Sequence, residues 1–168
     1  DQDILRLSEI SERFSKIGSQ PKLKEIVVSE LISEVTDYMK NRLPNQSGVE
    51  INFTGNSNIN IQGDWVLLRW AVENLMKNAI DAMGTKNGVI SIDLRKTEAG
   101  IQLDVSDTGK GIPRVDWKNI FRPGHSSKPR GWGLGLSLTQ RIIEEIHGGS
   151  IKVLQSKPGK TIFRLYFP

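Results

Sequence analysis

The 168-residue sequence has no cysteine and no long hydrophobic run. The lack of cysteine excludes disulfides, thiolate metal sites and a cysteine nucleophile, and it fits a reducing compartment. No apolar stretch approaches the roughly 20 residues that a membrane-spanning helix needs, and no signal peptide opens the chain. The chain begins inside a helical pattern, so we expect it to be a fragment of a longer protein.

Net charge is also small, at +4. This modest cationic excess leaves nucleic acid, a membrane surface and a polyanionic small molecule open as ligands. Six basic side chains lie between Lys110 and Arg130, and six of the sixteen glycines lie in the same stretch, over 109–135. This mixture predicts a phosphate-handling loop; a solvated basic loop is the alternative. The aromatic residues do not alternate with the basic ones, as a stacking platform for single-stranded nucleic acid would require, so we expect no nucleic-acid partner.

The hydrophobic pattern predicts helices and strands that are segregated along the chain. Helices are expected over 1–17, from a cap at Ser29 onward, over 65–83 after an N-cap at Asp64, and over 136–146. Strands are expected at 49–53, 59–61, 89–94, 101–105, 151–154 and 161–167. This order predicts an α+β fold, with helices covering one face of a mixed sheet.

The predicted helix over 65–83 carries an unusual polar face. The polar residues that share or flank one side of it are Glu73, Asn74, Lys77, Asn78 and Asp81. Amide and carboxylate oxygens are ligands that Mg²⁺ prefers, together with water and phosphate. The pattern predicts a face that binds metal or phosphate, and an ordinary amphipathic helix with a wet polar face is the alternative.

Asp107 lies where the predicted strand over 101–105 ends, directly before the glycine-rich segment TGKGIP. Its carboxylate can accept hydrogen bonds from an amino group such as that of a purine. Bare backbone at Gly109 and Gly111 lets a flat ring approach closely. A second glycine-rich run, GWGLGL at 131–136, has neither the G-x-G-x-x-G nor the P-loop spacing. It leads directly into the N-terminus of the helix predicted over 136–146, where free backbone amides favour an anion.

Four segments together resemble the motifs of the sensor histidine kinases. ENLMKNAIDA resembles the N box, SDTGKGIP the G1 box, NIFRP the F box and GWGLGLSL the G2 box. Their order and gaps are family-like over residues 22–168. The chain is identified as a member of the GHKL superfamily, which also holds gyrase, mismatch-repair ATPases and a heat-shock chaperone. The resemblance implies the Bergerat ATP-binding fold, a two-layer α/β sandwich in which helices cover one face of a mixed, mostly antiparallel sheet.

The resemblance also implies an ATP site under a mobile lid at 114–130. Asn78 would coordinate Mg²⁺ between the phosphates, Asn74 would support it from one turn earlier, and Asp107 would bind the adenine amino group. Glu73 and Asn74 are the candidate catalytic residues. The residues expected to contact nucleotide are Asn74, Lys77, Asn78, Asp81, Asp107, Gly109, Gly111, Ile112, Phe121, His125, Ser126, Ser127, Lys128, Arg130, Gly131, Gly133, Leu134, Gly135, Leu136 and Thr161.

Two features of the N box depart from the family pattern. Many of these kinases carry a lysine at the position of Asp81, so another cation would supply the counter-charge, from among Lys77, Lys128 and Arg130. Hydrolytic relatives place a water-activating glutamate at the position of Asn74 in this chain. The glutamate here is one residue earlier, about 100° round the helix, so it is aimed differently if it acts as a base.

A third departure concerns the phosphoacceptor. The chain has two histidines, His125 in the lid and His147 before two glycines, where a role in ending a helix is expected. Neither is a plausible acceptor, so the target histidine is expected outside this chain. Residues 1–20 then resemble the remnant of a dimerisation helix and linker, and residues 21–168 the ATP-binding catalytic domain.

The leading hypothesis is the catalytic domain of a sensor histidine protein kinase of a two-component system. It would position Mg-ATP for γ-phosphoryl transfer to a histidine on the dimerisation helices of a homodimeric, full-length protein. That protein would pass the phosphate to a response-regulator receiver domain, and this chain would be a cytoplasmic part of a larger sensor. An ATP hydrolase or serine protein kinase of the same fold is one alternative, and a non-catalytic nucleotide-sensing module is another.

Overall fold

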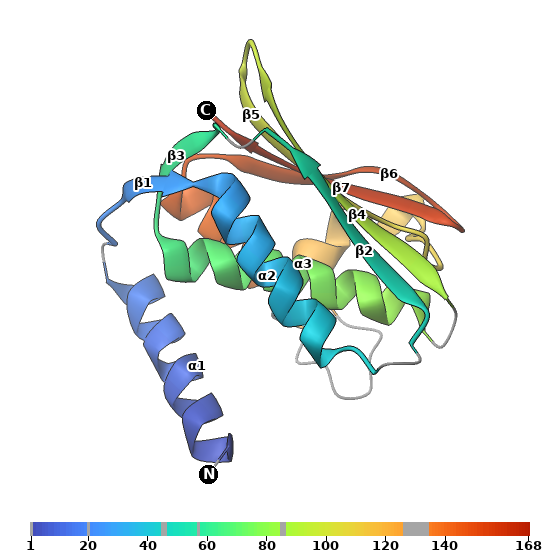
Figure 1. The fold of residues 1–168 in the computed structure, drawn as a ribbon, viewed down its shortest axis with the longest axis horizontal. Helices are drawn as coiled ribbons and strands as arrows, with labels where there is room; N and C mark the ends of the chain where they lie inside the picture. The colour runs from blue at the N-terminus through green and yellow to red at the C-terminus, as the bar shows by residue number, and fades with distance from the viewer. Residues whose placement is uncertain (1, 20, 45–46, 57, 85–86, 126–134) are drawn as a thin grey trace.

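The structure, a computed structural model, describes the chain apart from residues 1, 20, 45–46, 57, 85–86 and 126–134 (Figure 1). Its helical elements are α1 (Gln2–Gly18), α2 (Val28–Arg42), α3 (Trp65–Met83), α4 (Gly135–Arg141), the π-helical turn η3 (Ile142–Ile146), and the 3₁₀ turns η1 (Arg114–Asp116) and η2 (Asn119–Phe121). Its strands are β1 (Lys24–Val27), β2 (Val49–Gly55), β3 (Asn60–Gly63), β4 (Gly88–Thr97), β5 (Gly100–Asp107), β6 (Ser150–Lys157) and β7 (Lys160–Phe167).

Five of these strands form one sheet in the order β2-β4-β5-β7-β6. The β2–β4 pair is parallel and the other three pairs are antiparallel. Helices α2 and α3 cover one face of this sheet, and β1 and β3 form a separate two-stranded ribbon beside it (Figure 1). The predicted two-layer α+β sandwich with a mixed, mostly antiparallel sheet is therefore confirmed.

Strand β5 shows how the sequence builds the layer between sheet and helices. Ile101, Leu103 and Val105 are buried, whereas the side chains between them lie half-buried on the opposite face. Because strand side chains alternate between the two faces, the next inward position belongs to Asp107. On the outward face, Asp104 accepts two hydrogen bonds from Arg164, at 2.8 and 2.9 Å.

Helix α3 begins and ends where the sequence predicts. The Asp64 carboxylate accepts a 3.0 Å hydrogen bond from the Leu67 amide, which satisfies one of the free donors at the helix start. The helix ends at Met83, before Gly84 with φ of 61°. The helix also packs against β4 and β5, and this contact fixes the position of the N-box residues above the sheet.

One predicted helix cap is wrong, and one predicted helix changes type before its end. Ser29 does not cap α2, because the unpredicted strand β1 runs directly into the helix and the cap position falls at Val27, with no side-chain hydrogen bond. The Val28 amide donates instead to Ile59 of the ribbon, at 3.0 Å. The helix predicted over 136–146 is α-helical only to Arg141 and closes as a π-turn, in which the His147 amide reaches back five residues to the Ile142 carbonyl.

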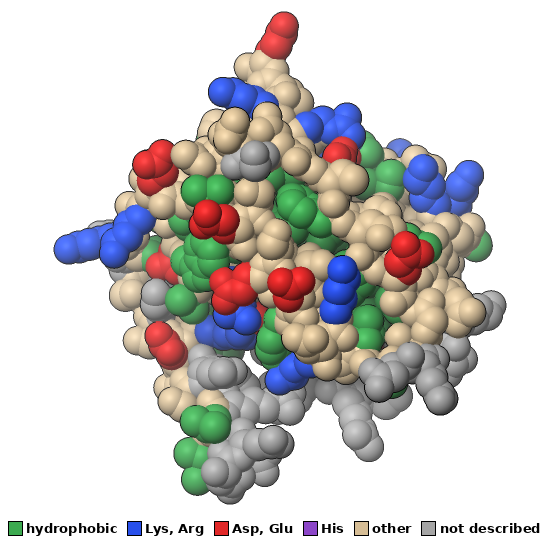
Figure 2. All heavy atoms as spheres, viewed as in Figure 1, with side chains coloured by type: hydrophobic (Ala, Val, Ile, Leu, Met, Phe, Trp, Pro, Cys, Tyr) green, Lys and Arg blue, Asp and Glu red, His purple; other side chains and the backbone are tan. Residues whose placement is uncertain are grey.

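Helix α1 extends away from the body of the molecule and contacts α3 (Figure 1). Ile4, Leu5 and Leu7 are each 66% exposed, while Phe14 meets Trp70 edge-on with 5.8 Å between ring centroids. On the face seen in Figure 2, acidic and basic side chains are interspersed over the body. Within the described ranges, no helix is both long and apolar enough to span a bilayer.

Candidate functional site

Asp107 occupies the last inward position of β5. Its side chain is 4% exposed, and one carboxylate oxygen accepts a 2.8 Å hydrogen bond from the Gly109 amide. Burial raises the pKa of the Asp107 carboxyl above its usual range, and the hydrogen bond from Gly109 acts in the opposite direction. A buried carboxylate held by one backbone amide keeps acceptor capacity for a further donor.

Thr161 lies across from Asp107 on the neighbouring strand β7. It is 2% exposed, and its hydroxyl lies 2.7 Å from the hydroxyl of Ser156. The Ser156 oxygen also accepts a 2.7 Å hydrogen bond from the Ile112 amide, so the hairpin is joined to the glycine-rich loop after β5. Ser156 is not among the predicted site residues, because a serine near a turn carries no distinguishing signal.

At the two glycine positions after Asp107, neighbouring backbone leaves no room for a side chain. A Cβ atom on Gly109 would lie 2.7 Å from the Ala82 carbonyl at the end of α3, and the Lys110 amide donates to that carbonyl at 3.0 Å. Gly111 has φ of 84°, and a Cβ there would meet the backbone of Lys157. The loop is thus clamped between α3 and the β6–β7 turn; the predicted contact of these glycines with a purine ring stays a prediction.

The asparagine face of α3 lies against the start of α4. The Asn74 amide group donates to the Gly135 carbonyl at 3.4 Å, and Thr139 donates to the same carbonyl at 2.8 Å. Asn78 lies one turn further along α3 and is half-buried, whereas Lys77 and Asp81 are exposed. The structure therefore brings the N-box amides beside the beginning of the last helix, where Leu136 is half-buried.

Glu73 belongs to another interface. Its carboxylate is 2% exposed and accepts a 3.1 Å hydrogen bond from Arg13 of α1. The Arg69 Nε lies 3.2 Å from the second oxygen, close enough for an ion pair but not aligned for a hydrogen bond. The carboxylate thus holds α1 against α3, and its predicted part as a general base stays a prediction.

The remaining predicted contacts are divided between the core, the surface and residues outside the described ranges. Phe121 is buried and meets Phe163 edge-on at 6.3 Å between centroids, Ile112 is half-buried, and His125 is exposed. The predicted residues that lie outside the described residues are Ser126, Ser127, Lys128, Arg130, Gly131, Gly133 and Leu134.

Amide oxygens, rather than a carboxylate cluster, are the metal ligands that this site offers. In the part of the chain that the structure describes, no group of three or more His, Cys, Asp or Glu side chains could hold a metal ion. Mg²⁺ keeps several waters and binds through few protein oxygens when substrate phosphates complete its octahedron. Asn74 and Asn78 fit a metal that arrives with a polyphosphate.

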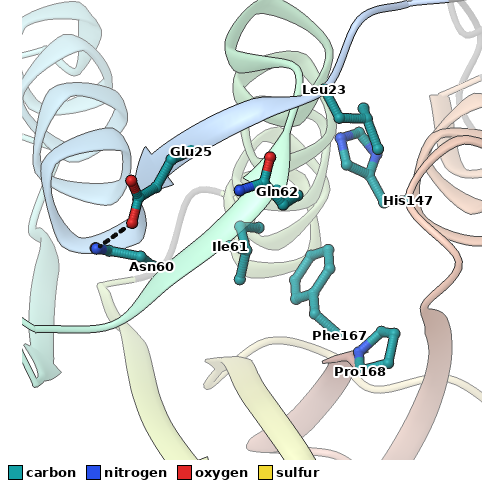
Figure 3. Close-up of a pocket in the computed structure, with 8 residues that line it drawn as sticks. All are labelled: Leu23, Glu25, Asn60, Ile61, Gln62, His147, Phe167 and Pro168. Atoms are coloured by element: carbon teal, nitrogen blue, oxygen red, sulfur yellow. Dashed lines mark hydrogen bonds between the residues drawn. The ribbon is translucent and has the colours of Figure 1, made fainter.

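A cleft of about 360 Å³ lies at the opposite end of α3, between the β1–β3 ribbon and the end of β7 (Figure 3). None of the predicted site residues that the structure describes lines this cleft, but His147 does. The His147 Nε2 accepts from the Asp64 amide at 3.0 Å, and Nδ1 lies 2.7 Å from the Ile142 carbonyl, which requires the neutral tautomer with a proton on Nδ1. Burial lowers the pKa of His147. As predicted, this histidine completes a helix end.

Comparison with known proteins gives the family. Residues 63–168, from Gly63 ahead of α3 to the end of the chain, match the histidine kinase-, DNA gyrase B- and HSP90-like ATPases. Sensor histidine kinase ZraS of Escherichia coli is 37% identical over 125 residues, which are 74% of this chain and 26% of ZraS. The catalytic domain of histidine kinase ThkA has a TM-score of 0.80 at 29% identity, covering 88% of this chain and 96% of that domain.

A second ThkA structure, in complex with the response regulator TrrA, has a TM-score of 0.76 at 26% identity and covers 99% of this chain and 49% of that one. The chain belongs to the histidine kinase-, DNA gyrase B- and HSP90-like ATPase family. Among its members, it is similar to the catalytic, ATP-binding domains of sensor histidine kinases, as the four sequence motifs predict. It spans about a quarter of the length of ZraS.

Proposed function

We propose that this chain is the catalytic domain of a sensor histidine protein kinase and that it positions Mg-ATP for γ-phosphoryl transfer to a histidine outside the chain. The observation that carries the proposal is the buried Asp107 carboxylate at the inward end of β5, which retains acceptor capacity. It accepts from the adenine amino group, and Thr161 contacts the ring beside it. A polar group buried this deeply is costly unless a partner uses it, and adenine supplies that partner.

The phosphates and the metal lie along the other end of the site. Asn78 provides an amide oxygen to Mg²⁺, which neutralises charge on the phosphates, and Asn74 supports this arrangement beside the start of α4. Phosphoryl transfer asks a protein mainly for positioning and charge stabilisation. Lys77 is the described cation nearest along the helix, and we assign it the counter-charge that Asp81 cannot give.

The target histidine and the response regulator belong to other parts of the signalling system. The complex of ThkA with TrrA supports a receiver domain as the partner. The exposed apolar side chains Ile4, Leu5 and Leu7 support α1 as one of a pair of dimerisation helices in a homodimer, because such a stripe needs another helix to cover it. We place the domain on the cytoplasmic side of a larger sensor, where ATP and the regulator are available.

Calorimetric titration with a non-hydrolysable ATP analogue, with and without Mg²⁺, tests the proposal. We expect metal-assisted binding to the wild type and an affinity about 10- to 100-fold weaker in Asp107→Asn. An unchanged affinity in that variant would contradict the adenine assignment. With radiolabelled ATP, we expect no label on His125 or His147; label on either would show that the acceptor lies within the chain.

A further inference from the structure

Ser156 reaches the adenine end of the site because of a β-bulge. In β6, Ile151 and Val153 are buried facing the helices, and strict alternation would next bring Gln155 inward. The register shifts between Val153 and Gln155, so one extra residue stands in β6 opposite β7. After the shift, Ser156 is the partner of Thr161 and shares its inward face.

Counting protons and lone pairs favours one of the two directions that the hydroxyl contact allows. The Ile112 amide can only donate, so its 2.7 Å contact uses a lone pair of the Ser156 oxygen and leaves the serine proton free. Among the described residues, the other hydrogen-bond contact of that oxygen is the Thr161 hydroxyl, at 2.7 Å. The arrangement that uses every group has Ser156 donating to Thr161. Thr161 then keeps its own proton for a ligand.

We propose that Ser156 is a positioning residue that holds the Thr161 hydroxyl as a hydrogen-bond donor toward the purine ring. The inference rests on the proposed function, because it needs a base beside Asp107. Adenine places an amino donor next to the ring acceptor N1. Asp107 accepts from the first, and Thr161 donates to the second, directly or through a water. A base with a carbonyl at position 6 and a proton on N1 presents the opposite pattern and is rejected.

The test compares ADP with 1-deaza-ADP, in which N1 is replaced by a C–H group, by calorimetric titration. In the wild type we expect a preference for ADP of about tenfold, the effect of one hydrogen bond. In Ser156→Ala the Thr161 hydroxyl is free to rotate, so the preference falls below about threefold. Ser156→Thr restores it. The matched control is Ser106→Ala, on the outward face of β5, which keeps the wild-type preference.

The ratio of the affinities for ADP and 1-deaza-ADP distinguishes a positioning role of Ser156 from a purely structural one. If Ser156 only anchors the loop at Ile112, Ser156→Ala weakens both ligands equally and the preference stays near tenfold, which would overturn the inference. If Ser156→Ala does not fold, Ser156→Cys serves instead, because a thiol is a weak donor, and the preference should again fall. Failure of the wild type to bind ADP at all would overturn the proposed function itself. A wild type that binds both nucleotides equally would leave the proposed function standing and contradict the role of Ser156.

Discussion

Glu73 and Asn74 are neighbours on α3, yet they belong to two interfaces built in different ways. On the α1 side, the Glu73 carboxylate is buried against Arg13 and Arg69, and the Arg13 guanidinium also lies over the Trp70 ring at 5.3 Å. On the α4 side, Asn74 makes one 3.4 Å hydrogen bond and Asn78 is only half-buried. Among the described residues, the charges of the first interface pair with one another, whereas we propose that the amides of the second bind a ligand.

This difference separates a structural use of buried charge from a functional one. Opposite charges that bury each other hold two helices together. A buried carboxylate with a single backbone donor, such as Asp107, costs stability in the absence of ligand. Substitutions on the two sides should therefore change different quantities: stability and α1 docking on one side, nucleotide binding on the other.

The largest effect is expected from Asp107→Asn. It should weaken binding of an ATP analogue by about 10- to 100-fold, because the charge-assisted hydrogen bond that we propose to the adenine amino group would be lost. Since burial raises the pKa of Asp107, the ionised carboxylate opposes folding as the pH rises through the folded pKa, and the variant should unfold at no lower temperature than the wild type at pH 7. Titration calorimetry and thermal unfolding measure the two quantities.

Asp104→Asn is the matched control on the same strand. Its carboxylate lies on the outward face and pairs with Arg164, so nucleotide affinity should stay within about twofold of wild type. An equal loss of affinity in both variants would show that the effect comes from the strand and not from the inward carboxylate.

Glu73→Gln should act mainly on stability. It removes a buried charge from two arginines that remain partly exposed, 19% and 29%, so we expect a loss of about 1–2 kcal/mol in the free energy of unfolding, measured by urea titration. Glu34→Gln is the comparison, because Glu34 is 46% exposed and pairs with the same Arg69; we expect a loss of less than about 0.5 kcal/mol there.

ATP turnover that disappears in Glu73→Gln while nucleotide affinity persists would favour the hydrolase alternative.

Asn78→Ala should reduce the affinity for the ATP analogue about tenfold in the presence of Mg²⁺ and much less in its absence, because we propose the amide oxygen as a metal ligand. Paired titrations with Mg²⁺ and with a chelator measure the difference. Asn52→Ala, on an exposed position of β2, should change neither value. A metal-independent loss in Asn78→Ala would assign this amide to the nucleotide directly.

The smallest effect is expected at the other end of α3 and concerns pH. Burial lowers the pKa of His147 below its usual 6.5, so the folded state binds fewer protons than the unfolded state. The stabilising contribution of the neutral ring is present above pH 6.5 and is lost as the pH falls from there through the folded pKa. Unfolding free energies between pH 7.5 and 5 should fall less steeply in His147→Gln, whereas His125→Gln, at an exposed site, should keep the wild-type slope.

Local signals in the sequence predict the parts of the fold that local chemistry determines. Asp64 and Gly84 mark the two ends of α3, and the alternation of β5 carries Asp107 to the inward face. Two elements were not predicted. Strand β1 has four residues and runs into α2 with no turn residue between them, and the last helix closes with a π-turn at His147. These depend on partners far along the chain, such as Ile59 and Asp64.

The site follows the same division. The N-box amides could be identified because helical spacing alone puts Asn74 and Asn78 on one face. Ser156 could not be identified in this way. A bulge in β6 determines which face of the sheet its side chain lies on, and no residue type in that strand predicts a bulge. Glu73 and Arg13 are 60 residues apart, so no local pattern could predict which side chain the Glu73 carboxylate would contact.

A crystal structure of the chain with a non-hydrolysable ATP analogue and Mg²⁺ is the most direct test of the central claim, that Asp107 and Asn78 hold opposite ends of one nucleotide. The account predicts the adenine amino group at about 3 Å from an Asp107 oxygen and the metal at about 2.1 Å from the Asn78 amide oxygen. An adenine ring bound away from Asp107, or a metal remote from Asn78, would contradict it.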